Sequence, residues 1–146
     1  MGVIQQLPQL PKNTLLHIDP YLINQPTDNG YDYLDVFVKA SLKGMKCILW
    51  YGFHTLDEKK ELNTFIRNKL ADKGIQAGAW IELIMNITQQ NSILCNPGIL
   101  GSGILTSNLS SESVANMTHY SKLLEDHYRK MVYKGFDGGI YRDLLL

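Results

Sequence analysis

The residues best suited to do chemistry are Asp19, Pro20 and Tyr21, which directly follow an apolar run that ends at Ile18. This order is typical of a buried parallel strand whose carboxyl end presents polar groups to a crevice. The alternative is a core strand that ends in an Asp-Pro turn, where Asp19 only accepts backbone hydrogen bonds. The local pattern leaves both interpretations open.

The histidines are weaker candidates. His54 follows a second apolar run and would lie at a pocket at the strand ends, or else be a solvent-exposed residue just before a helix cap at Thr55. His17 lies within the first apolar run, so we expect it in the core. His119 and His127 are too far apart along one helix for the four-residue metal spacing. The histidines therefore predict no metal site.

Composition indicates an ordinary globular domain. The chain has 146 residues, of which 45% are hydrophobic and 19% charged, and Lys+Arg 14 balances Asp+Glu 14. This balance gives no overall positive field to attract nucleic acid. Cys47 and Cys95 are too few for a disulfide framework and lack a metal-ligand spacing. We find no signal peptide and no apolar run of membrane-spanning length, so we expect a cytoplasmic protein without a membrane partner.

The elements that must position Asp19 alternate between strands and helices. Strands are predicted at residues 14–18, 45–53, 75–86 and 104–109. Helices are predicted at 31–42, with a stop at Gly44, from Thr55 to Gly74, and from Ser110 or Ser111 to about residue 131. Two strand–helix units in succession imply parallel pairing, and the absence of a helix between the last two strands implies an antiparallel pair.

The expected fold is therefore α/β, a single domain over residues 1–146. It has a mixed sheet of about four strands, a terminal antiparallel pair and flanking helices. Residues 91–103, which include Gly101 and Gly103, are expected to be a loop, and the glycine-rich residues after 131 an irregular tail.

Three local expectations concern individual residues. Thr55 with Glu58 three positions later predicts a capping box. Glu82 has no evident partner in the sequence, so we expect it to face solvent or a helix. The first strand is strongly apolar, yet the chain supplies no strand for its second edge. Such an edge favours pairing with another copy of the chain, as a homo-oligomer, or with a partner chain.

Four stretches, taken in order, carry a likeness to a known family. They are a proline-containing lead-in at 7–8 followed by His-Ile-Asp-Pro-Tyr at 17–21, Leu-Trp-Tyr at 49–51, Trp-Ile-Glu-Leu at 80–83, and Gly-Ser-Gly-Ile-Leu at 101–105 with Asn108. The chain resembles the carboxyl-terminal half of a class I S-adenosylmethionine-dependent methyltransferase. More closely, it resembles the adenine-N6 methyltransferases of large-subunit ribosomal RNA, formerly described as proteins for the use of external DNA. The resemblance implies a partial Rossmann-like methyltransferase fold.

The resemblance implies S-adenosylmethionine as cofactor and an adenine amino group of rRNA or DNA as acceptor. That amino nitrogen is a poor nucleophile because its lone pair is delocalised into the ring. The Asp19 carboxylate and the Pro20 carbonyl would accept its two hydrogens and orient the nitrogen towards the methyl group. Tyr21 would stack on the flipped base, and Tyr51 and His54 are the further candidates for substrate binding.

The sequence departs from the family pattern in two respects. Only Pro20 separates Asp19 from Tyr21, where the family has two residues, and Gly52 follows Tyr51, where the family has proline. The Gly-rich loop and the acidic residue that hold the cofactor in class I methyltransferases are also missing, so no cofactor-binding residue is assigned.

The resemblance thus implies a methyltransferase-like protein, related to the adenine-N6 methyltransferases of rRNA or DNA and to rRNA processing, that is not a competent catalyst by itself. The alternatives are a non-catalytic structural or oligomeric remnant of unknown function, and one half of a split enzyme.

Overall fold

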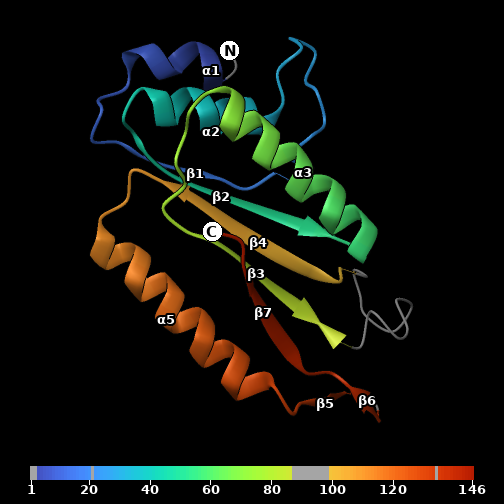
Figure 1. The fold of residues 1–146 in the computed structure, drawn as a ribbon. Helices are drawn as coiled ribbons and strands as arrows, with labels where there is room; N and C mark the ends of the chain where they lie inside the picture. Colours follow the sequence, from blue (N-terminus) through green and yellow to red (C-terminus); the bar gives the residue numbers. More distant parts are fainter. Residues whose placement is uncertain (1–2, 21, 87–98, 134) are drawn as a thin grey trace.

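The computed structural model describes residues 3–20, 22–86, 99–133 and 135–146. At its centre is a mixed five-stranded sheet in the order β1-β2-β4-β3-β7 (Figure 1). Strands β1 and β2 are parallel, and β4 is antiparallel to both of its neighbours, β2 and β3. The strands of this sheet are β1 (Leu15–Ile18), β2 (Lys46–Phe53), β3 (Trp80–Met85), β4 (Gly101–Ser107) and β7 (Ile140–Leu144).

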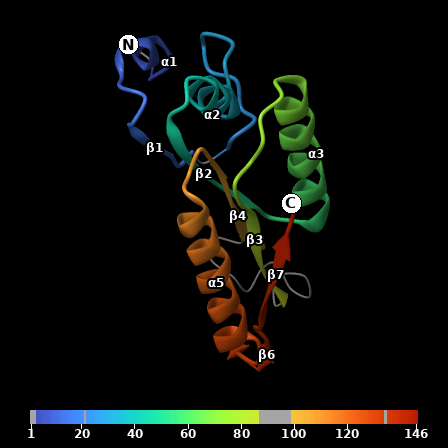
Figure 2. The ribbon, with the colours of Figure 1, turned by 60° about the vertical axis from the view of Figure 1, so that its left-hand side comes forward.

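Helices cover both faces of this sheet. Helices α1, α2 and α3 lie on one side and α5 lies on the other, as the two views together show (Figure 1, Figure 2). The helices are α1 (Val3–Gln6), continued by the 3₁₀ turn η1 (Leu7–Gln9), α2 (Tyr33–Leu42), α3 (Leu56–Asp72) and α5 (Ser111–Tyr128). A small hairpin of β5 (Val132–Tyr133) and β6 (Phe136–Asp137) links α5 to β7.

The main core lies between the sheet and helices α2 and α3. Alternate residues of β2, from Cys47 to Phe53, are fully buried, as a strand with one face against a helical layer requires. The apolar face of α2, which includes Leu34 and Phe37, is buried in the same cluster. Helix ends fall where the sequence predicts them, because Gly44 and Gly74 both adopt the left-handed conformation that ends a helix.

The expected parallel β1–α2–β2 unit and the antiparallel β3–β4 pair are both confirmed. The expected strand number is wrong, because the C-terminal segment predicted to be irregular forms β7 and pairs with β3. The sequence Ile-Tyr-Arg-Asp-Leu of this strand lacks the alternation of apolar and polar residues that marks a strand, and the nearby glycines suggested a loop. Strand β3 also begins at Trp80, later than expected.

Gly101 and Gly103 lie inside strand β4, and the expectation of a loop there is wrong. Their neighbours across the strand pair are Phe53 and Tyr51. A Cβ on Gly103 would come within 2.3 Å of the Tyr51 ring, and one on Gly101 within 2.8 Å of the Phe53 ring. Glycine is needed at both positions because the aromatic rings of β2 occupy that space.

The capping box predicted at Thr55 forms only in part. Thr55 accepts a hydrogen bond from the backbone N–H of Glu58, but the Glu58 carboxylate accepts from the N–H of His54 instead of Thr55. The complete capping box lies at the start of α2, between Asp32 and Asp35. The first strand, β1, is an edge strand as expected: β2 is its sole partner among the residues described.

Candidate functional site

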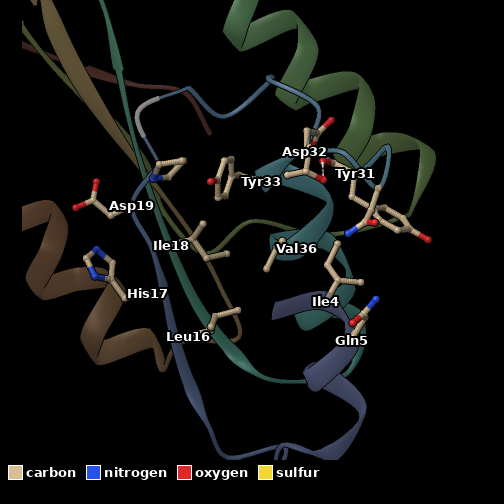
Figure 3. Close-up of a pocket in the computed structure, with 13 residues that line it drawn as sticks. Ile4, Gln5, Leu16, His17, Ile18, Asp19, Tyr31, Asp32, Tyr33 and Val36 are labelled. Carbon is tan, nitrogen blue, oxygen red and sulfur yellow. Dashed lines mark hydrogen bonds between the residues drawn. The ribbon is translucent and has the colours of Figure 1, made fainter. Parts of the chain in front are cut away.

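Asp19 and Pro20 lie just past the carboxyl end of β1 and line a pocket of about 400 Å³ between β1, α1 and α2 (Figure 3). The pocket has an apolar floor formed by Ile4, Leu16, Ile18 and Val36. Its remaining lining comes from polar and aromatic side chains, which are Gln5, His17, Thr27, Asn29, Tyr31, Asp32 and Tyr33. An apolar cavity with a few polar groups at its edge is the usual form of a small-molecule site.

The Asp19 side chain does not point into the middle of this pocket. Figure 3 shows the side chains of Asp19 and His17 on one side of β1, and those of Ile18 and Tyr33 on the other. Asp19 is exposed and borders the pocket at its edge. His17 is also exposed, and the expectation that it lies in the core is wrong. Pro20, in contrast, is buried.

An ion-pair cluster holds the helix end that borders the pocket. The Lys69 Nζ of α3 lies 2.5 Å from an Asp32 carboxylate oxygen and 2.8 Å from one of Asp35. Burial alone would raise the pKa of Asp35, but hydrogen bonds from Lys69 and the Asp32 backbone hold this pKa below its usual value. Burial opposes the charge on Lys69, yet its hydrogen bonds to Asp32 and Asp35 outweigh burial and raise its pKa. The start of α2 is therefore fixed to α3.

The other predicted substrate-binding residues do not join Asp19 and Pro20 at the pocket. Tyr51 is buried on β2, its hydroxyl donates to Glu82 Oε1 at 2.6 Å, and burial raises its pKa well above the usual value. His54 lies after β2, with its Nδ1 3.0 Å from a Glu58 carboxylate oxygen. Neither lines the pocket. Tyr21 lies outside the described residues.

Tyr51 belongs to a set of side chains that we name the buried polar network. Lys59 Nζ of α3 lies 2.9 Å from Glu82 Oε2 and 2.7 Å from an Asp143 oxygen on β7. Trp80 Nε1 donates to the Tyr51 hydroxyl at 2.6 Å. Asn63 Nδ2 completes the set with a long hydrogen bond of 3.5 Å to Glu82. The network thus consists of Tyr51, Lys59, Asn63, Trp80, Glu82 and Asp143.

For Glu82, sequence reasoning left solvent and a helix open and missed the partners of its carboxylate. It faces α3 and not solvent, with a relative exposure of 0%, and both of its carboxylate oxygens have hydrogen-bonding partners. A carboxylate within an otherwise apolar strand is the signal that could have identified it, because a buried charge needs partners. The network joins β2, β3, β7 and α3, and the pocket is lined by none of its members.

Two kinds of site receive no support from the described part of the chain. It contains no group of three or more His, Cys, Asp or Glu side chains placed to hold a metal ion. None of its helices is long and apolar enough to cross a membrane.

Comparison with known proteins provides a fold and no activity. No family model matches the sequence, and no curated protein matches it. Among solved structures, the chain is similar to protein LPL1258 from Legionella pneumophila str. Philadelphia 1, assigned to the family model DUF519. The TM-score is 0.60 at 16% identity, over 97% of this chain and 48% of LPL1258. The chain thus shares a fold with that protein and spans about half of its length.

Proposed function

We propose that this chain is the substrate-side half of an adenine-N6 methyltransferase-like protein that acts on rRNA or DNA. The observation that carries the proposal is the position of Asp19 and Pro20 at a mainly apolar pocket beyond the carboxyl end of a parallel strand. The order of the sheet supports it. A parallel β1–β2 pair followed by the antiparallel β3–β4 pair suits half of a Rossmann-like methyltransferase sheet.

In the proposed reaction, this half positions the acceptor nitrogen. The Pro20 carbonyl and the Asp19 carboxylate accept the two amino hydrogens of an adenine base, which directs the nitrogen lone pair towards the methyl donor. S-adenosylmethionine supplies the electrophilic methyl group when it is bound. The sequence has no Gly-rich loop after a first strand with an acidic residue beyond it. We therefore place the cofactor site on a separate half, and turnover requires both.

Adenine recognition can be tested on the chain by itself. Adenosine monophosphate (AMP) is titrated into the isotope-labelled protein, and the backbone amide resonances of β1 and Asp19 are followed by NMR. The matched ligand is N6,N6-dimethyl-AMP, which has no amino hydrogens. We expect it to bind about tenfold more weakly, because two hydrogen bonds are lost. Asp19→Ala should reduce this discrimination. Equal binding of both nucleotides, or shifts confined to other parts of the protein, would overturn the proposal.

The free edge of β1 supports a second candidate function, a non-catalytic oligomeric protein. Leu15 on this strand is exposed, and an exposed apolar edge strand pairs readily with another chain. In sedimentation velocity, the wild type would then be a homo-oligomer that Leu15→Lys dissociates. Leu144→Lys is the matched control, because Leu144 is exposed on β7, the opposite edge of the sheet. A monomeric wild type at micromolar concentration would exclude this candidate.

A further inference from the structure

We propose that Tyr33 is the side chain on which the base stacks in the pocket beside β1. This inference rests on the proposed function and assigns to Tyr33 a role that the resemblance gives to Tyr21. Tyr33 is the first residue of α2 and lines the pocket. Figure 3 shows its ring on the same side of β1 as Ile18 and Val36. A flat ring placed between them would contact an aromatic face on one side and aliphatic groups on the other.

Tyr33 keeps a large exposed ring on a fixed backbone. Tyr33 is 40% exposed. Its backbone N–H, in contrast, donates a hydrogen bond of 3.2 Å to the carbonyl of the buried Ile23. The preceding residue, Asp32, is held by the capping box and by Lys69. A tyrosine also loses little side-chain entropy when it orders against a ligand. The ring is therefore preorganised at low conformational cost.

Tyr31 lines the same pocket but is less suited to stacking. It is 39% exposed, nearly the same as Tyr33. However, the Lys39 ammonium lies 3.8 Å from its ring centroid and occupies one face. For the Tyr33 ring, no cation or aromatic partner is found within the described part of the chain. The two tyrosines are thus a matched pair that differ in the availability of the ring face.

The charges around the pocket select the class of ligand. Among the described residues, its lining includes Asp19 and Asp32, the latter paired with Lys69, and no lysine or arginine. Such a pocket disfavours a phosphate or carboxylate and suits a neutral heterocycle that carries hydrogen-bond donors. Gln5, Thr27 and Asn29 add side chains that can pair with the polar edge of a base. A nucleotide would therefore enter with the base first and leave its phosphate in solvent.

The inference is tested by titrating AMP into the wild type and into Tyr33→Ala, Tyr33→Phe and Tyr31→Ala. We expect Tyr33→Ala to weaken binding roughly tenfold, since removal of a stacking ring has an effect of this size. Tyr33→Phe retains the aromatic face, and Tyr31→Ala removes only the ring covered by Lys39, so both should stay within about twofold. Upfield ring-current shifts of the adenine protons should appear with the wild type and disappear with Tyr33→Ala.

The outcomes separate this inference from the proposed function. Unchanged affinity and unchanged adenine shifts in Tyr33→Ala would overturn the stacking role while leaving recognition by Asp19 and Pro20 intact. A different outcome is that the wild type binds AMP and N6,N6-dimethyl-AMP equally well and that Tyr33→Ala binds neither. This outcome would support stacking and overturn amino-group recognition. No binding of AMP by the wild type would overturn both. Unchanged amide shifts far from α2 serve as the check that each variant is folded.

Discussion

The pocket beside β1 and the buried polar network beneath α3 place a carboxylate in opposite environments. Asp19 is exposed at a strand end, and none of the described residues donates a hydrogen bond to it. Glu82 lies in mid-strand with no exposure, and Tyr51, Asn63 and Lys59 surround its carboxylate. A carboxylate whose partners are all inside the protein stabilises one arrangement of the chain, whereas one with unused acceptor capacity can serve a ligand. The contrast favours a structural role for Glu82, and it leaves Asp19 available for the ligand recognition that we propose.

The sharpest way to break this contrast is Lys59→Met, which removes the cation beside Glu82 and leaves its buried charge uncompensated. We expect a loss of about 3–5 kcal/mol in the free energy of unfolding, measured by urea denaturation. Lys60→Met is the control on the same helix. Lys60 is exposed and pairs only with exposed Asp57, so its loss should stay within about 0.5 kcal/mol. Similar losses in both variants would show that the network contributes little.

Gly103→Ala tests the space that the network requires. The new methyl carbon would lie 2.3 Å from the Tyr51 ring, which is packed in the core and cannot move aside. Overpacking of this kind should lower the free energy of unfolding by about 1–3 kcal/mol, measured by urea denaturation. Gly52→Ala on β2 is the milder comparison, since its nearest contact would be the Trp50 ring at 3.2 Å. A smaller loss for Gly103→Ala than for Gly52→Ala would contradict the predicted packing.

Tyr51→Phe removes the hydroxyl that donates to Glu82 and accepts from Trp80. Two buried polar groups lose a partner, so we expect a loss of about 1–3 kcal/mol at neutral pH. The Tyr33→Phe variant serves as the control and should be nearly as stable as the wild type, because Tyr33 is 40% exposed. If Tyr51→Phe were as stable as this control, the hydroxyl would have no structural role.

The same network predicts a loss of stability in alkali. Burial and the adjacent Glu82 raise the pKa of Tyr51. For Lys59, burial lowers the pKa, but the hydrogen bonds to Asp143 and Glu82 outweigh it and raise the pKa overall. Both groups keep their protons longer in the folded state, so their contribution is complete below the unfolded pKa of about 10 and is lost as pH rises further. Urea denaturation from pH 8 to 11 should show a shallower decline for Tyr51→Phe; an identical decline would contradict this.

Asp19→Asn should have the smallest effect on folding. The side chain is exposed, so the free energy of unfolding should change by no more than about 0.5 kcal/mol. We expect the substitution to act on ligand binding instead. Loss of the carboxylate should reduce the preference of the protein for AMP over N6,N6-dimethyl-AMP. A large loss of stability, measured by the same urea denaturation, would show that Asp19 has a structural role and would remove the contrast with Glu82.

Local signals account for what the sequence predicts well. The β1–α2–β2 unit and α3 follow from apolar periodicity, cap residues and the glycines after each helix, all of which act within a few residues. The candidate site is predicted only in part. Asp19 and Pro20 are found at a pocket, but Tyr31 and Tyr33 at the same pocket carry no local mark that separates them from helix-packing residues.

The sequence by itself determined the order of these elements, the antiparallel β3–β4 pair and the polar end of β1. Only the tertiary structure decided that β7 joins the sheet, that Glu82 is buried, and that the Tyr33 ring lies beside the pocket. The physical reason is distance along the chain. Glu82 pairs with Tyr51 across 31 positions and Lys59 with Asp143 across 84. Contacts of this separation depend on which strands become neighbours, and no local pattern of residues carries that information.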